Sequence, residues 1–147
     1  MSSQYVAAHQ NVREYIDNHV FRYRVAVHTL GRQYVNRKSE NHLSIYLLLG
    51  ADRSFHLDMK PTDDETKPFV GKVILQGRPF LQSSTVLEWA DLAARGCPAN
   101  FNPSRRQEPT AGSPTVRDFI LACTTARFHY FRFLCHEDNP VGCRTWV

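Results

Sequence analysis

Three residues of this 147-residue chain could together form a site for nucleophilic chemistry: Cys143, His42 and His56. A cysteine attacks as the thiolate, and a free thiol with a pKa of about 8.5 is mostly protonated until a nearby histidine or helix N-terminus lowers that pKa. Cys143 follows Pro140 and Gly142, which can force a sharp turn. The segment "CRTWV" could then begin a helix whose amides point at the sulfur. His42 would be the general base, and His56 would orient it, as a third group generally orients a base.

The two histidines are expected on one β-hairpin. The segments "HLSIYLLL" (42–49) and "SFHLDM" (54–59) flank "GADR", a short turn containing glycine and aspartate. Side chains alternate between the two faces of a strand, so a single register places the apolar residues of both strands on one side. The other face then carries His42, Ser44, Tyr46, His56 and Asp58.

Tyr46 and Ser44 share the predicted face of His42. A phenol placed beside a reacting centre can donate to a developing oxyanion or position a substrate. We therefore take Tyr46 and Ser44 as candidate substrate-positioning residues.

The segment from Asn41 to Val147 resembles the circularly permuted papain-like fold of the lecithin:retinol acyltransferase-like group. Members of that group open a strand with a histidine, turn, and place a second histidine before a leucine, as in "HLSIYLLLGADRSFHL". Their nucleophile lies in a short cysteine motif that ends in an aromatic residue and valine, as in "GCRTWV". The resemblance implies Cys143 as nucleophile, His42 as base and His56 as the orienting residue. The chain has Gly142 where that group usually has asparagine.

A second resemblance concerns the pattern NHxSIYL followed near the end by GCRxW. This pattern is similar to that of a small uncharacterised domain found in filamentous fungi. That similarity implies no particular reaction.

The remaining elements are expected to form one α+β domain over residues 1–147, an antiparallel sheet with helices packed on one face. Helical spacing predicts an N-terminal helix within 1–20, and alternation predicts a strand over 22–30. "GKVILQG" (71–77) reads as a further strand, and Thr85 with Glu88 predicts a capping box for a helix over 85–95. A long surface loop over 97–113 precedes a helix that begins at Ser113 and Pro114, and "RFHYFRFLC" (127–135) predicts the last strand.

Charge and hydropathy argue against several classes of protein. The formal net charge is +4, but lysines and arginines are scattered rather than gathered into a patch, so no nucleic-acid partner is expected. No apolar stretch approaches the roughly 20 residues of a membrane helix, and the first residues lack a secretory signal. We expect a cytoplasmic protein whose four cysteines are free thiols.

Simpler roles for these residues stay open. One alternative is that His42 only caps a strand and bonds a backbone carbonyl. Cys123 falls on the apolar face of its predicted helix, where cysteine is usually a small core residue. Cys135, His136, Cys143 and His129 match no common zinc spacing. No metal and no cofactor are predicted.

These residues favour a thiol-dependent acyl-transfer enzyme, a hydrolase or acyltransferase acting on an ester, thioester or amide of a small molecule or acyl substrate. One alternative is a small-molecule cyclase or isomerase in which His42, His56 and Tyr46 transfer protons. Another is a non-catalytic binding domain. The substrate and the oligomeric state stay open.

Overall fold

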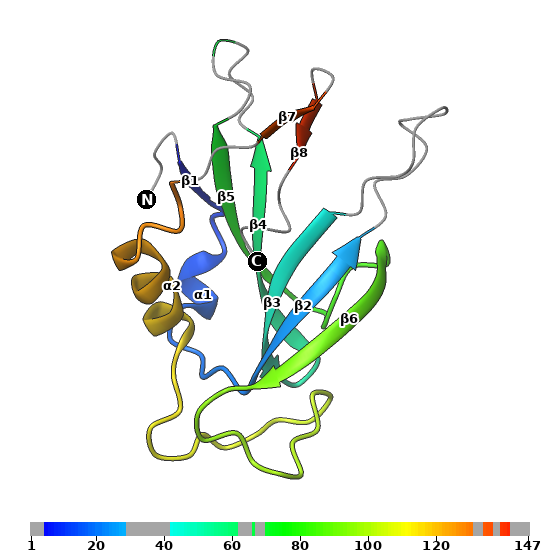
Figure 1. Ribbon diagram of the computed structural model, residues 1–147. Coiled ribbons are helices and arrows are strands. Elements are labelled where there is room, and N and C mark those ends of the chain that lie inside the picture. Colours follow the sequence, from blue (N-terminus) through cyan, green and yellow to red (C-terminus); the bar gives the residue numbers. More distant parts are fainter. Residues whose placement is uncertain are drawn as a thin grey trace.

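The fold is known from a computed structural model that describes residues 5–28, 42–61, 66, 70–130, 134–136 and 139–141. The described elements are β1 (Val6–Ala8), α1 (Val12–Tyr15), β2 (Arg22–His28), β3 (His42–Gly50), β4 (Arg53–Pro61), β5 (Gly71–Arg78), β6 (Val86–Ala93), α2 (Val116–Thr125), β7 (Leu134–His136) and β8 (Asn139–Val141). Strands therefore dominate the described part of the chain, and the fold is mostly β (Figure 1).

Six strands form one sheet in the order β1-β5-β4-β3-β2-β6, and β7 pairs with β8 in a separate ribbon. The neighbours from β5 to β6 in that order are antiparallel, but β1 runs parallel to β5 and pairs Val6 with Val73. The prediction of an antiparallel sheet is therefore wrong at this edge, and the sheet is mixed. The parallel pairing arises because the N-terminal segment forms a short strand that no local sequence pattern predicts.

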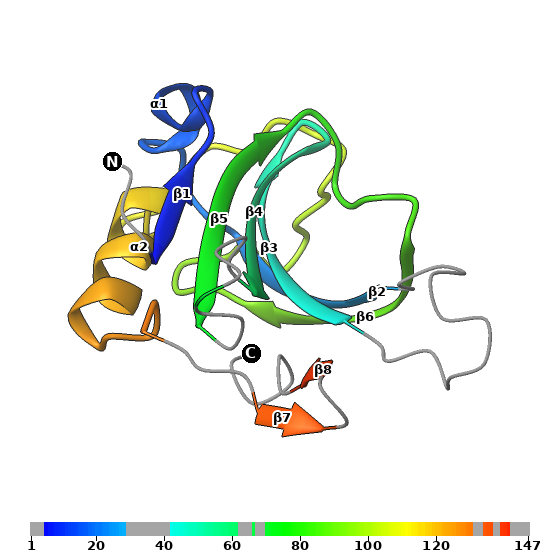
Figure 2. The same cartoon turned by 90° about the horizontal axis from the view of Figure 1, so that it is seen from above.

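The sheet curves strongly when it is seen from above (Figure 2). Helix α2 lies on its outer side, and the connection between β5 and β6 crosses its inner side. Because side chains alternate along each strand, the same strands contribute one row of residues to each side.

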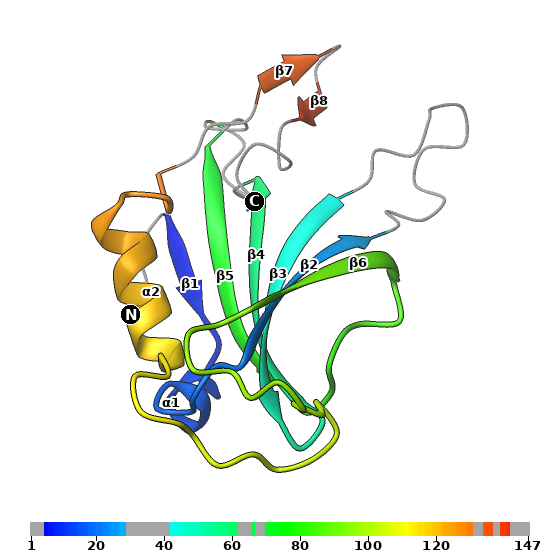
Figure 3. The same cartoon turned by 60° about the horizontal axis from the view of Figure 1, so that its bottom comes forward.

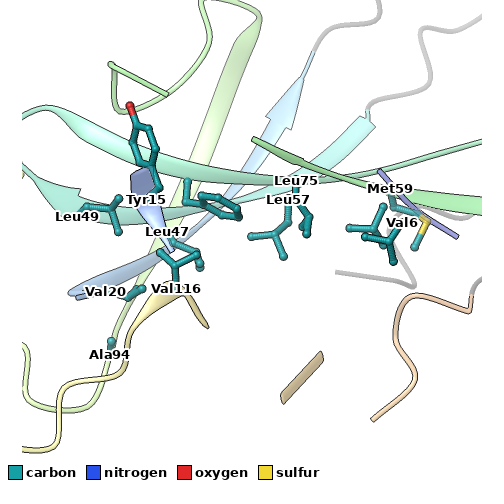
Figure 4. Packing of buried hydrophobic residues seen from close by; sticks show 12 residues of the cluster. Val6, Tyr15, Val20, Leu47, Leu49, Leu57, Met59, Leu75, Ala94 and Val116 are labelled. Atoms are coloured by element: carbon teal, nitrogen blue, oxygen red, sulfur yellow. The ribbon is translucent and has the colours of Figure 1, made fainter. Parts of the chain in front are cut away.

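The outer side of the sheet is apolar and carries the larger core. Leu47, Phe55 and Leu57 have almost no exposed surface, and Val116 of α2 is fully buried among them (Figure 4). Phe119 and Ile120 of the same helix pack against this cluster. The helix covers the sheet because its apolar residues recur at helical spacing, as the sequence predicts.

Helix α2 begins where its capping residues place it. The Thr115 side chain accepts from the Asp118 amide, and the Asp118 carboxylate accepts from the Thr115 amide, which together form a capping box. The predicted helix start at Ser113 and Pro114 is thus confirmed to within a few residues.

The inner side of the sheet joins a small apolar cluster to a polar row. Phe21, Ala26, Leu48 and Phe101 belong to the apolar cluster, and the rings of Phe21 and Phe101 stack with centroids 5.1 Å apart. Tyr46 joins this cluster to the polar side chains that continue toward the start of β3.

The helix predicted over 85–95 is wrong, because Val86–Ala93 is the edge strand β6. Thr85 and Glu88 do have capping-box spacing, but β6 pairs with β2 instead, with one register shift between Val27 and His28. Arg24 secures that pairing through a bidentate ion pair with Asp91, at 2.7 and 2.9 Å. Pairing with β2, which is distant in the sequence, and the ion pair of Arg24 therefore outweigh the local helical pattern.

The ends of the chain also differ from expectation. Among the described residues within 1–20, only Val12–Tyr15 is an α-helix, and β1 precedes it. Residues 127–130 follow α2 as turn and coil rather than as strand, and among the described residues of the predicted last strand Leu134–His136 is extended. Residues 97–113 form neither helix nor strand, and they run beneath the sheet from β6 toward α2 (Figure 3).

Candidate active site

A histidine and a carboxylate meet on the inner side of the sheet, where β3 begins and β4 nears its end. Nε2 of His42 is hydrogen-bonded to Oδ1 of Asp58. The Asp58 side chain is only 9% exposed, and the ammonium of Lys60 lies 3.4 Å from its second oxygen. Because an ionised carboxylate only accepts hydrogen bonds, Nε2 of His42 must carry the proton in this contact. Nδ1 of His42 is then the nitrogen whose protonation can change.

A second chain of hydrogen bonds lies beside this pair. The hydroxyl of Ser44 is 2.5 Å from Nε2 of His28 and 2.8 Å from Nε2 of His56, and Ser44 is fully buried. Nδ1 of His28 continues the chain to the hydroxyl of Thr85 at 2.8 Å. β2, β3 and β4 each contribute one residue to the Ser44 junction, so the chain forms only when the three strands pair.

The Ser44 hydroxyl can donate only one hydrogen bond. It therefore donates to one histidine Nε2 while the other histidine donates to it. Either direction satisfies all three groups, and reversing it requires each histidine to exchange its tautomer. The junction is thus an uncharged hydrogen-bonded relay in either arrangement.

Tyr46 closes the cluster on the side of the apolar residues. Its ring stacks on that of His56 at a centroid distance of 4.2 Å with an angle of 13° between the planes. The Tyr46 hydroxyl accepts from the amide of Ser83, at 3.2 Å, in the connection that crosses the inner side of the sheet. The phenol is therefore held in place by a ring contact on one side and an amide on the other.

Burial sets the charge of the cluster. It lowers the pKa of His56 to about 3, and it also lowers the pKa of His28, with a further contribution from the neighbouring His42. Both imidazoles are therefore neutral near pH 7. Burial alone would raise the pKa of Asp58, but the hydrogen bond from His42 and the nearby histidines hold it below its usual value. Burial raises the pKa of Tyr46, which keeps the phenol protonated.

The structure brings together four of the predicted site residues: His42, Ser44, Tyr46 and His56. The predicted hairpin register is confirmed, since Tyr46 lies opposite His56. The orienting contact to His42 comes from Asp58, whereas His56 contacts Ser44. Cys143, the predicted nucleophile, lies outside the described residues, so its place relative to His42 stays a prediction.

Two residues of the cluster had no predicted role. Asp58 was expected on the correct face, and its spacing two residues after His56 was the available signal. His28 enters through the pairing of β2 with β3, which sets it directly opposite His42. No local spacing links these two histidines, because a polar segment separates their strands in the sequence.

Within the described ranges, no three or more histidine, cysteine, aspartate or glutamate side chains are grouped so as to hold a metal ion. The geometry agrees with this, because Ser44 stands between His28 and His56, and Asp58 contacts His42 through the imidazole nitrogen. Likewise, no helix in the described part of the chain is long and apolar enough to cross a membrane.

The fold and the site define a mostly β protein with a buried histidine and carboxylate cluster on the inner side of a curved mixed sheet. A family model described as "Domain of unknown function (DUF7770)" matches residues 23–147, which include every residue of this cluster. The chain belongs to the DUF7770 family. It matches no curated protein and no solved structure.

Proposed function

We propose that the protein is a thiol-dependent acyl-transfer enzyme in which Cys143 is the nucleophile, His42 the general base and Asp58 the residue that orients His42. The observation that carries the proposal is the hydrogen bond from Nε2 of His42 to Asp58. A buried carboxylate that fixes the tautomer and direction of an imidazole is the third member of a nucleophile, base and orienting group.

In the proposed reaction, Nδ1 of His42 takes the proton of the Cys143 thiol, and the sulfur attacks the carbonyl carbon of an ester, thioester or amide. The bond to the leaving group breaks, and the leaving group receives the proton from His42. Water or an amine then attacks the acyl thioester, gives its proton to His42, and releases the thiol. Asp58 stabilises the imidazolium that forms in each step, and its low pKa keeps it ionised for that role.

The neutral relay of His28, Ser44 and His56 supports this assignment of roles. Since His28 and His56 are uncharged near neutral pH, they add no positive charge that would oppose protonation of His42. Tyr46 is the proposed substrate-positioning donor, because its phenol stays protonated beside the same cluster.

A second candidate, a cyclase or isomerase that works by proton transfer alone, is favoured by one observation. His42, His56 and Tyr46, three side chains able to transfer protons, lie on one face of β3 and β4. Such an enzyme would not need Cys143, so the reactivity of that thiol separates the two candidates.

Thiol labelling with iodoacetamide at pH 7, read by mass spectrometry of the peptides, tests the proposal. We expect Cys143 to react faster than Cys97, which is half-buried. His42→Gln and Asp58→Asn should each slow labelling of Cys143 by about tenfold or more, since the thiolate fraction falls when its base is lost or misaligned.

His9→Gln is the matched control, because His9 is exposed and lies outside the cluster. It should leave the labelling rate of Cys143 unchanged. Equal labelling of Cys143 and Cys97 in the unmodified protein, with no effect of His42→Gln, would rule out the thiol mechanism and favour proton transfer alone.

A further inference from the structure

A cavity of about 410 Å³ lies at the other end of β3 from the histidine cluster. The turn between β3 and β4 forms one wall, and residues 106–109 form another. His42 and Gly50 mark the two ends of β3, and a strand rises about 3.3 Å per residue. The cavity therefore lies about 25 Å along β3 from His42 and is separate from the proposed active site.

The cavity has a charged rim and an apolar part. Phe21 and Leu49, which are only 2% and 9% exposed, are among its apolar lining residues, and Arg53 and Arg106 are its two arginines. Its volume falls within the range of about 300 to 1,000 Å³ that is usual for sites that hold small molecules.

The contacts that hold Arg53 in place are with an aromatic ring and an amide oxygen, and neither neutralises its charge. Its guanidinium lies 4.4 Å from the centroid of the Tyr15 ring, and Nη1 donates to Oδ1 of Asn18 at 3.2 Å. A guanidinium carries five N–H donors, so this contact leaves most of them for another acceptor. Within the described ranges, neither Arg53 nor Arg106 is paired with a carboxylate.

The acidic residues of the rim do not balance these cations. Asp17 is already paired with Arg117, at 3.0 Å. Glu108 is then the one lining carboxylate in the described residues without an ion pair, against two unpaired arginines. The rim therefore favours an anion.

The turn that forms the cavity wall is fixed in an uncommon conformation. Gly50, Ala51 and Asp52 have φ angles of 82°, 52° and 58°. The amides of Ala51 and Asp52 donate to the carbonyls of Arg105 and Pro103, at 2.9 and 3.0 Å. These bonds tie the turn to the segment that leads directly into residues 106–109, so the two walls are held together before any ligand binds.

We propose that this cavity is a binding site for a small organic anion, a carboxylate or a phosphate ester, that Arg53 and Arg106 hold through its oxygens. Guanidinium groups suit both anions, because their N–H donors match two oxygens of a carboxylate or phosphate.

Titration followed by amide NMR shifts tests this proposal with benzoate and phenyl phosphate as probes and benzamide as their neutral counterpart. We expect saturable shifts at residues 50–53 and 106–108 with at least one anion, and binding of benzamide weaker by about tenfold or more. Comparing the affinity for benzoate with the affinity for phenyl phosphate shows which oxyanion the site prefers.

Arg53→Gln should weaken binding of the anion by about tenfold or more, whereas Arg13→Gln removes the same charge from an exposed position outside the cavity and should not. Arg106→Gln, in an exposed segment, provides a second variant if Arg53→Gln does not fold. The absence of saturable shifts with both anions, equal binding of benzamide, or undiminished binding by the arginine variant would overturn the proposal. None of these results depends on the reactivity of Cys143.

Discussion

The hydroxyl of Ser44 joins two buried imidazoles, and at the residue scale it holds the cluster together. Ser44→Ala would leave Nε2 of both His28 and His56 without this partner. A buried polar group without a hydrogen bond costs about 1 to 3 kcal/mol, so we expect a loss of about 2 kcal/mol in the free energy of unfolding. Urea denaturation at pH 7 measures it.

Ser84→Ala is the matched control, since Ser84 is exposed. It should change the free energy of unfolding by less than about 0.5 kcal/mol. A loss in Ser44→Ala no larger than that of the control would show that the two histidines find other partners.

The sequence predicts part of this cluster, and the reason is local. His42, Ser44, Tyr46, His56 and Asp58 belong to one hairpin, and strict alternation along two adjacent strands fixes their common face. His28 has no such signal, because it reaches the cluster through pairing with a strand whose register depends on the whole sheet. Side-chain rotamers decide whether a carboxylate or an imidazole orients His42, and residue spacing in the sequence does not predict those rotamers.

At the scale of the element, the turn between β3 and β4 is strained at Ala51, which is non-glycine with φ of 52°. Left-handed backbone costs an alanine about 1 kcal/mol or more relative to glycine, while glycine loses more entropy on folding. We therefore expect Ala51→Gly to raise the free energy of unfolding by about 0.5 kcal/mol, measured by urea denaturation.

Ala99→Gly provides the comparison, because Ala99 is exposed and has no positive φ. The same change there should lower stability slightly, as the unfolded chain gains freedom without relief of strain. If both substitutions lower stability equally, the turn at Ala51 is not strained.

A second element-scale contact joins β5 to the N-terminal segment. The Asn11 side chain donates to the carbonyl of Gly77 and accepts from its amide, at 2.8 and 3.2 Å, which extends the ladder that β1 begins. A Cβ at Gly77 would lie only 2.1 to 2.5 Å from ring carbons of Tyr15. The obstacle to a side chain at Gly77 is therefore the lack of space, not the backbone conformation.

Gly77→Ala should therefore lower the free energy of unfolding by about 1 to 3 kcal/mol, because the Tyr15 ring must move out of a buried position. Thermal or urea unfolding measures the loss. The double variant Gly77→Ala/Tyr15→Ala should lose less than the sum of the two single changes, since the clash is then removed. Strict additivity would contradict this account.

Elements were predictable where their signals are local. The β3–β4 hairpin and α2 have alternation, a turn and a capping box within a few residues of each other. Thr85, Glu88 and a run of good helix formers predict a helix where β6 lies, and only the pairing of β6 with β2 decides otherwise. β1 has three residues, which is too short for a period to be recognised.

At the scale of the whole molecule, the buried histidines make stability depend on pH. The pKa of His56 falls from 6.5 to about 3 on folding, and that of His28 is also lowered. Between these values the unfolded chain binds protons that the folded chain does not, so acid favours unfolding. Stability should be fully present above about pH 6.5 and should fall as the pH drops toward 3.

Urea midpoints at pH 7 and pH 5 check this expectation, and the midpoint should be lower at pH 5. His56→Gln should reduce the difference between the two midpoints, whereas His9→Gln, at an exposed position, should not. An unchanged difference in His56→Gln would show that His56 does not carry this pH dependence.

The two outermost strands of the sheet both find their neighbours far away in the chain. β1 pairs Val6 with Val73, and β6 pairs with β2, so that Arg22 meets Ala93. Closing such long stretches of chain costs entropy before any contact compensates for it, and folding rates fall as contacting residues lie further apart. During synthesis the central hairpin can form early, but the β1 edge must wait until β5 ends at Arg78, and the β6 edge until Ala93 has left the ribosome. Until then the growing chain presents unpaired strand edges to its surroundings, the condition in which nascent chains associate with one another or are bound by chaperones.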